Sequence, residues 1–264
     1  MTETVDHRRV ALTSFFIGIA AGMFGGLLGV GGGVIMVPLL TGVAGLTQHE
    51  AHAASLAGVV VTGLGGAFTY AADNALDLRV AVVLASVAVL ATFAAASYAS
   101  RVPAMRLRAV FGGFLIFAAA LLIAKDELLG LRAPQGSLST VFLIGTGLFV
   151  GVASGLLGIG GGALMVPLLV IGLGMTQHVA QGTSLAAMIP SGVSGTIAHL
   201  RTGALRRDAV LGLAPGIILG SWAGGRLALG MASGTLQLVF AVALTLLGIQ
   251  YLLGLRRARR ARLS

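Results

Sequence analysis

The chain has 264 residues, of which 57% are hydrophobic and only 9% are charged, and its mean hydropathy is +1.00. One core could not bury that much apolar surface, so the composition excludes a soluble globular protein and indicates a lipid environment. The formal net charge of +9 comes from arginines at the ends of apolar runs, which is typical of topology signals and argues against nucleic-acid binding. Zero cysteines exclude disulfides, thiolate metal sites and cysteine nucleophiles.

A duplication organises the sequence. The stretch that begins at Gly22 returns 129 residues later, at Gly151, and about 18 of 30 positions are identical. Both copies contain the pattern G-x-G-G-G-x(4)-P-L, at 29–39 and 158–168, and both continue to a Thr-Gln-His triplet. The chain therefore consists of two related halves.

Nearly uninterrupted apolar runs predict helices, because the strands of a membrane β-barrel would alternate polar and apolar residues. The predicted segments, in chain order, are 10–29, 34–46, 50–72, 79–99, 107–124, 138–158, 163–175, 179–200, 209–229 and 236–254. Segments 34–46 and 163–175 would each measure only about 20 Å as helices, which is short for a crossing. We therefore expect these two to be half-helices or strongly tilted helices.

Five segments per half is an odd number, so the two repeats should be inverted relative to each other. The loops support this inversion, since equivalent loops carry opposite arginine loads. Loop 73–79 has one arginine and its counterpart 201–208 has three, whereas loop 100–108 has three arginines and its counterpart 230–235 has none. An arrangement of eight spanning segments, in which the glycine-rich segments fold back, is the alternative.

The predicted fold is an all-α integral membrane protein of about ten helical segments, built as two inverted five-helix repeats with glycine-broken helices. We assign residues 1–124 to the first transmembrane repeat, 125–137 to an external linker, and 138–264 to the second repeat with a basic cytoplasmic tail. Placing the arginine-rich loops inside puts both termini in the cytoplasm.

Paired glycine breaks at matching positions of two inverted halves point to the central site of a transporter. A run of glycines unwinds the helix and frees backbone N–H groups, and the helix that resumes there directs its positive end at the break. An anion is therefore the expected ligand, although the glycines could serve close helix packing alone. The predicted substrate-binding glycines are Gly31, Gly32, Gly33, Gly160, Gly161 and Gly162.

Polar residues after each break form the second predicted group, because hydroxyl and amide donors suit an oxyanion and histidine can carry a proton. The substrate-binding candidates are Thr47, Gln48, His49 and Ser55 in the first half and Thr176, Gln177, His178, Thr183 and Ser184 in the second. The proton-coupling candidates are Glu50, His52, His49 and His178. The alternative for both Thr-Gln-His segments is an interfacial loop. No cofactor or metal is expected, since the glycine pattern lacks the spacing of a nucleotide fingerprint.

At these residues the chain resembles the TauE/SafE sulfite exporter family of bacterial and archaeal inner-membrane transporters. The resemblance rests on the two glycine-proline blocks, on Ala180–Leu185, which is similar to the family's A-x-G-T-S-L, and on Gly203-Ala204-Leu205. The first half is a looser match, reading A-H-A-A-S-L at Ala51–Leu56. The resemblance implies a duplicated helical permease that moves sulfite, sulfonates or related anions, usually outward, with protons as a candidate coupling ion.

The leading hypothesis is a secondary transporter working by alternating access, with a small anion and the lipid bilayer as partners. An uncoupled anion channel or uniporter is the alternative within the same class. An intramembrane enzyme using Ser55 or Ser184 is a third hypothesis, but the sequence lacks a G-x-S-x-G elbow, so we predict that the protein is not an enzyme. Glycine-rich helix faces could pack within one monomer or between the subunits of a homo-oligomer.

Overall fold

The computed structural model describes residues 7–98, 104–128, 137–157, 161–201 and 205–260, and these are helical apart from short connections. The helices are α1 (His7–Leu28), α2 (Gly33–Gly42), α3 (Gln48–Ala72), α4 (Leu78–Tyr98), α5 (Ala104–Leu128), α6 (Ser137–Leu157), α7 (Gly162–Gly172), α8 (Gln177–Arg201), α9 (Arg207–Leu229) and α10 (Ser233–Arg260). Each predicted segment corresponds to one of these helices, which differ from the predictions by a few residues at their ends. The predicted all-helical fold is confirmed.

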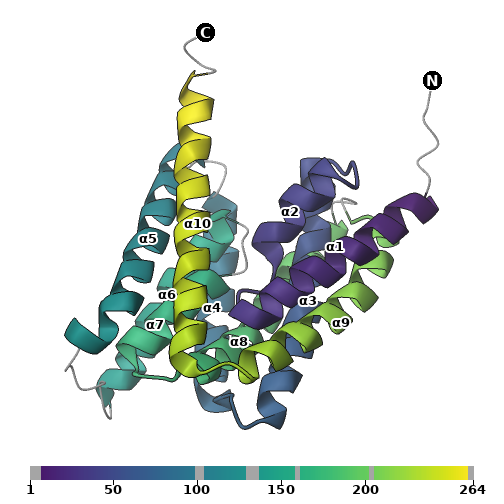
Figure 1. Ribbon diagram of the computed structural model, residues 1–264. Coiled ribbons are helices and arrows are strands. Elements are labelled where there is room, and N and C mark those ends of the chain that lie inside the picture. The colour runs from purple at the N-terminus through teal and green to yellow at the C-terminus, as the bar shows by residue number, and fades with distance from the viewer. Residues whose placement is uncertain (1–6, 99–103, 129–136, 158–160, 202–204, 261–264) are drawn as a thin grey trace.

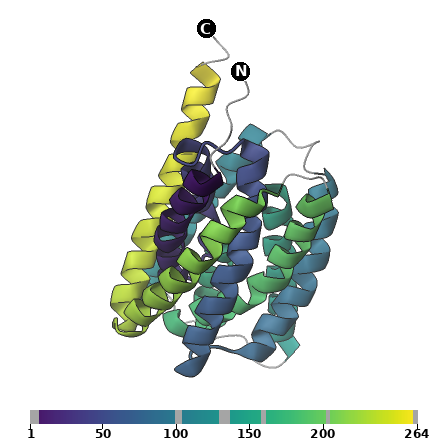
Figure 2. The ribbon, with the colours of Figure 1, turned by 90° about the vertical axis from the view of Figure 1, so that its right-hand side faces the viewer.

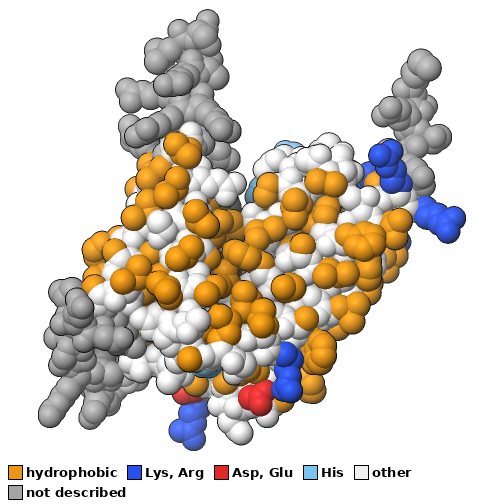
Figure 3. Space-filling view, in the orientation of Figure 1, with side chains coloured by type: hydrophobic (Ala, Val, Ile, Leu, Met, Phe, Trp, Pro, Cys, Tyr) orange, Lys and Arg blue, Asp and Glu red, His pale blue; other side chains and the backbone are white. Residues whose placement is uncertain are grey.

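Several helices are long and apolar enough to cross a membrane. Among the described residues, five meet this criterion by length and composition: α1, α3, α4, α9 and α10. Large apolar side chains cover the outside of the molecule, as Figure 3 shows on one face, and examples are Phe16, Phe68 and Trp222, which are 62%, 77% and 57% exposed. Such a surface is suited to lipid rather than to water.

Helices α1 and α9 lie side by side along their length, as both ribbon views show (Figures 1 and 2). Small residues allow this contact, because a Cβ atom added to Gly22 would lie 2.7 Å from the carbonyl oxygen of Ile217. Seven glycines hold the two backbones together in this way: Gly18, Gly22 and Gly26 on α1, and Gly212, Gly216, Gly220 and Gly224 on α9. This four-residue spacing is typical of close helix packing in membranes.

The other extended contacts join α4 to α6, α3 to α8 and α5 to α10. When each helix is replaced by its counterpart in the other half, α1–α9 and α4–α6 exchange with each other. The pairs α3–α8 and α5–α10 each map onto themselves. The packing around the α5–α10 pair departs from this symmetry, because α5 also packs on α7 and α10 on α8. Among the described residues, neither α5 nor α10 makes a comparable contact with α2 or α3.

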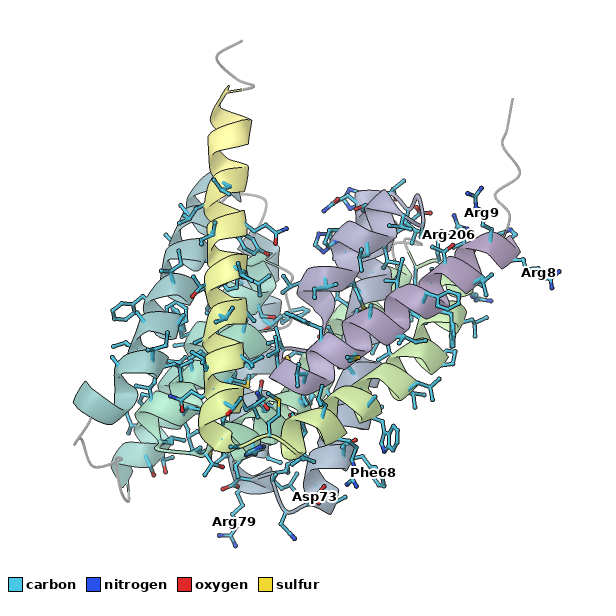
Figure 4. The ribbon with its side chains drawn as sticks, viewed as in Figure 1. Arg8, Arg9, Phe68, Asp73, Arg79 and Arg206 are labelled. Carbon is cyan, nitrogen blue, oxygen red and sulfur yellow. The ribbon has the colours of Figure 1, made fainter. Side chains whose placement is uncertain are left out.

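Helix α1 begins and helix α10 ends on the same side of the molecule, which we call the terminal face (Figure 1). Arg8, Arg9 and Arg206 lie at this end, whereas Asp73 and Arg79, from the α3–α4 connection, lie at the other end, the opposite face (Figure 4). Helix α3 thus runs from the terminal face to the opposite face. Helix α8 runs the other way, because its start contacts the end of α3 through Gln181 and Tyr70 and its His199 interacts electrostatically with His49 near the start of α3.

Candidate substrate site at the glycine breaks

Both short helices begin at a glycine that adopts a left-handed backbone conformation. Gly32 caps α2 with φ of 71°, and Gly161, its duplicate, caps α7 with φ of 78°. A residue with a side chain is strained at such a φ, so the sequence needs glycine there to end one helix and start the next in a new direction. The predicted breaks are thus present in both halves, although Gly160 lies outside the described residues.

The two breaks touch each other in the interior. A Cβ atom on Gly162 would lie 2.7 Å from the carbonyl oxygen of Gly29 and 2.8 Å from the Cα atom of Val30. It would also lie 2.8 Å from the sulfur of Met188 on α8. The duplicated glycines therefore bring the starts of α2 and α7 to one place between the two faces.

The start of α2 presents buried backbone amides. The first bonds into this helix are donated by Ile35 and Met36 to the carbonyl of Gly32, at 3.0 Å each. None of the hydrogen bonds between described residues uses the N–H groups of Gly31–Val34, and Gly31–Gly33 are buried. Free amides at the positive end of a helix make a site that favours an anion.

Two duplicated serines line the α1–α2 break. The hydroxyl of Ser184 donates to the carbonyl of Gly29 at 3.1 Å, and that of Ser55 reaches the carbonyl of Gly33 at 3.5 Å. Both side chains are buried. Gly29 lies in the connection between the helices, whereas Gly33 is the first residue of α2. Because both hydroxyl protons point to carbonyls, each hydroxyl must rotate before it can donate to a ligand.

The sequence prediction missed Tyr70, which lies beside this break. Its side chain is fully buried, and its hydroxyl lies 3.0 Å from the carbonyl of Gly26, near the end of α1, and 2.8 Å from Oε1 of Gln181. A tyrosine near the end of an apolar run is typical of the membrane interface. Its sequence position therefore did not indicate a contact with Gly26 and Gln181 beside the break.

The first Thr-Gln-His segment lies away from the breaks, at the terminal face. Thr47 caps α3 in a capping box, in which the carboxylate of Glu50 accepts from both the N–H and the hydroxyl of Thr47 at 2.8 Å. Gln48 and His49 are exposed, and Nε2 of Gln48 lies 3.4 Å from Nε2 of His52. Helix α2, which is ten residues long and begins at Gly33, lies between the break and this segment in the chain.

The second Thr-Gln-His segment starts α8 at the opposite end of the molecule. The hydroxyl of Thr176 accepts from the N–H of Val179 at 3.4 Å, and Nε2 of His178 lies 3.0 Å from the carbonyl of Ala228. Gln177 is only 1% exposed, and neither atom of its amide has a hydrogen-bond partner among the described residues.

The side chain of Thr183 contacts the α3–α4 connection rather than the glycine breaks. Its hydroxyl accepts from the N–H of Asp77 at 3.0 Å, and Asp77 in turn accepts from the N–H of Val80, near the start of α4. Close by, the guanidinium of Arg226 at the end of α9 pairs with Asp73 at 3.2 Å. Of the predicted residues, the structure thus brings together the described glycines of the breaks, Ser55 and Ser184, and leaves the Thr-Gln-His segments at the helix starts.

The surface is hollowed on the terminal face, between α10 on one side and α1 and α2 on the other, and histidine side chains lie at the rim (Figure 3). This hollow lies where the α5–α10 pair makes no extended contact with α2 or α3. Within the described part of the chain, no group of three or more His, Cys, Asp or Glu side chains could hold a metal ion. The described groups near the breaks that could bind a ligand are backbone amides, hydroxyls and carboxamides.

Comparison with known proteins shows the family. Residues 14–251 match the family described as sulfite exporter TauE/SafE. The chain is 27% identical to the probable membrane transporter protein YdhB of Bacillus subtilis over 220 residues, which cover 82% of this chain and 88% of YdhB. It is 25% identical to the probable membrane transporter protein YunE of the same organism, over 89% of this chain and 94% of YunE.

A probable membrane transporter protein of Xylella fastidiosa shares 32% identity over 67% of this chain and 69% of its own length. No solved structure matches the chain significantly. The family is one of transporters and not of enzymes, and its members include archaeal as well as bacterial proteins. The match spans almost the whole chain, and the chain therefore belongs to the sulfite exporter TauE/SafE family of multi-pass membrane transporters.

Proposed function

We propose that the protein is a secondary transporter that exports small sulfur-containing oxyanions, such as sulfite or organosulfonates, by alternating access. The observation that carries this proposal is the contact between the two glycine breaks, at Gly29–Val30 and Gly162. The free amides of Gly31–Val34, next to this contact, offer an anion a site between the two faces. Sulfur enters the proposal from the family description alone.

Two observations support an inverted relation between the halves. The helix pairs α1–α9 and α4–α6 exchange when the halves are exchanged, and α3–α8 and α5–α10 each map onto themselves. The second observation is direction, since α3 and its duplicate α8 run opposite ways between the faces. Two such halves would form equivalent gates on the two sides of one central site.

The central site would recognise its substrate without a fixed positive charge. The groups near the breaks are the amides of Gly31–Val34 and the hydroxyls of Ser55 and Ser184. Neutral donors hold an anion less tightly than an arginine would, which suits a carrier that must also release it. We propose these groups as the substrate contacts.

Proton coupling is part of the proposal, with His49, His52, His178 and Glu50 as the candidate proton carriers. Glu50→Gln is the most informative variant, because glutamine can retain the capping bonds to Thr47 but cannot bind and release a proton. If Glu50 couples protons, this variant should abolish the dependence of transport on a pH gradient while the melting temperature stays unchanged. If the pH dependence persists, the role of Glu50 is limited to the cap.

The central site is tested by transport of radiolabelled sulfite in proteoliposomes, with a sulfonate as competitor, for Gly31→Ala and Gly45→Ala. Both glycines have positive φ, 80° and 68°, so both variants carry a similar backbone strain. At Gly31 the new methyl would meet the flexible end of Met188 at 3.1 Å, whereas Gly45 has nothing within 4 Å.

We expect Gly31→Ala to lower the transport rate about tenfold or more, because a displaced binding amide is costly, and Gly45→Ala to stay within about twofold of wild type. Equal loss in both variants would show that backbone strain, not the site, is responsible. Movement of sulfite that shows no counterflow would indicate a channel instead of a carrier. No movement by well-folded wild type would refute sulfite as the substrate.

A further inference from the structure

Helices α3 and α8 carry the same pattern of polar residues on one face. The spacing i, i+4 and i+7 places three side chains in a row along a helix. We call the two rows the α3 stripe and the α8 stripe, and they consist of Gln48, His52 and Ser55, and of Gln177, Gln181 and Ser184. The three pairs of residues are related by the same 129-residue offset as the glycine breaks.

The two stripes start at different faces and meet at the breaks. The α3 stripe begins with Gln48 at the terminal face and ends at Ser55, whose hydroxyl reaches the carbonyl of Gly33. The α8 stripe begins with Gln177 toward the opposite face and ends at Ser184, whose hydroxyl donates to Gly29. Placed end to end, the stripes form a row of polar side chains from one face to the other.

The two stripes differ in exposure. In the α3 stripe Gln48 is exposed, and it lies 3.4 Å from His52. In the α8 stripe Gln177 and Gln181 are 1% and 0% exposed. Within the described part of the chain, both amide atoms of Gln177 and Nε2 of Gln181 have no hydrogen-bond partner. Burying an amide without a hydrogen bond is unfavourable, so such groups point to a ligand or to a different conformation.

The orientation of the Gln181 amide does not remove this deficit. The hydroxyl of Tyr70 has one proton but lies near two acceptors, the carbonyl of Gly26 and Oε1 of Gln181. If the amide is turned, Nε2 donates to Tyr70 and Tyr70 donates to Gly26, and Oε1 takes the position without a partner. In either orientation one polar atom of Gln181 stays unpaired.

We infer that Gln177 and Gln181 are the substrate contacts of the closed half of the transport pathway, and that they bind a singly charged oxyanion when this half opens to the opposite face. This inference rests on the proposed function. Neither stripe contains lysine or arginine, so carboxamides and hydroxyls must replace the hydration of the substrate. Because the cost of desolvation grows with the square of the charge, such a path favours a monoanion over a dianion such as sulfate.

The absence of native cysteines permits a direct test with single-cysteine variants at duplicated positions, Gln48→Cys and Gln177→Cys. Each is reconstituted and treated from either side with a membrane-impermeant methanethiosulfonate reagent. We expect Gln48→Cys to react rapidly from the terminal face and Gln177→Cys slowly from the opposite face. Adding Tyr70→Phe should speed the second reaction about tenfold, because it removes the hydroxyl that joins α1 to Gln181.

A Gln177→Cys protein that stays unreactive from both sides, with and without Tyr70→Phe, would overturn the inference. So would reaction from the terminal face only. This labelling needs no substrate, so it stays informative even if sulfite proves not to be transported. Methanesulfonate, which does not react with the reagent, should slow labelling at Gln177→Cys, and an equal effect of sulfate would refute the preference for monoanions.

Transport supplies an independent readout. Gln177→Leu and Gln181→Leu should each lower sulfonate transport about tenfold or more, through loss of a buried hydrogen bond to the substrate. Gln250→Leu is the matched control, because Gln250 is exposed on α10, and it should stay within about twofold of wild type. Wild-type transport by both α8 variants would contradict the inference, since a glutamine that only occupies space can be replaced by leucine.

Discussion

The same three residues, Thr-Gln-His, begin α3 and α8, and their surroundings differ. At the start of α3, Gln48 and His49 are exposed. At the start of α8, Gln177 is buried and His178 contacts the end of α9. The neighbours explain this difference, because α5 packs on α7 and α10 on α8, whereas among the described residues neither helix makes a comparable contact with α2 or α3. Identical sequence thus marks equivalent positions, and packing decides which of them is accessible.

The largest difference between the two helix starts is expected at Gly182 and its duplicate Ala53. A Cβ atom on Gly182 would collide with the carbonyl oxygen of Ala75 and lie 2.7 Å from Cβ of Tyr70. Gly182→Ala should therefore lower the free energy of unfolding by about 2 kcal/mol or more, measured as a fall in melting temperature in detergent. The reciprocal variant, Ala53→Gly, should cost only about 1 kcal/mol. An unchanged melting temperature for Gly182→Ala would show that the α3–α4 connection is loosely packed.

The two histidines should differ next. His178→Ala removes the side chain that lies 3.0 Å from the carbonyl of Ala228, and we expect a loss of about 1 kcal/mol in the free energy of unfolding. His49 is exposed, so His49→Ala should leave stability within about 0.5 kcal/mol of wild type. Thermal unfolding of the two variants side by side measures the contrast, and equal stability would contradict the assignment of His178 to a structural contact.

The two threonines should show a smaller contrast. Thr47 takes part in a complete capping box with Glu50, whereas Thr176 has only the 3.4 Å bond from Val179, which cannot reciprocate. We expect Thr47→Ala to cost about 1 kcal/mol and Thr176→Ala only a few tenths. Melting temperatures of the two variants provide the test. A larger loss for Thr176→Ala than for Thr47→Ala would mean that burial at the start of α8 matters more than the second hydrogen bond of the capping box.

The smallest effect is expected at the ion pair of Arg226 and Asp73 on the opposite face. Both side chains are about half exposed, at 58% and 44%, so solvent screens their attraction. Asp73→Asn should change the free energy of unfolding by about 0.5 kcal/mol or less, and the change should vanish in high salt. A larger, salt-independent loss would show that this pair helps to keep the α8 start closed.

Much of the fold could be predicted from sequence, because the apolar runs and the glycine breaks are local features. The predicted segments 34–46 and 163–175 correspond to α2 and α7, and each helix begins one residue before its predicted start, at Gly33 and Gly162. The pairing of α1 with α9 was not predicted, although the regular glycines of α9 carried a signal for it. Pairing between distant segments depends on shape complementarity, which a linear pattern does not specify.

The candidate site was predictable in part. The glycines lie at the centre with Ser55 and Ser184, but Thr47 caps a helix at the surface. A polar residue near a break can face the break or the start of the next helix, and its sequence position does not distinguish the two. Tyr70 becomes visible only through its contact with Gln181, because 111 residues separate the two in the chain.

The glycine contact between α1 and α9 has a consequence for biogenesis. Helix α1 finds the helix on which it packs most extensively only after α2 to α8 have been synthesised, since α9 begins at Arg207. Until then its glycine face must rest against lipid or a chaperone, which are poorer neighbours for exposed backbone than a second helix. Each half of the duplication therefore depends on the other to complete its folding, and the ancestral unit would have needed a second copy of itself.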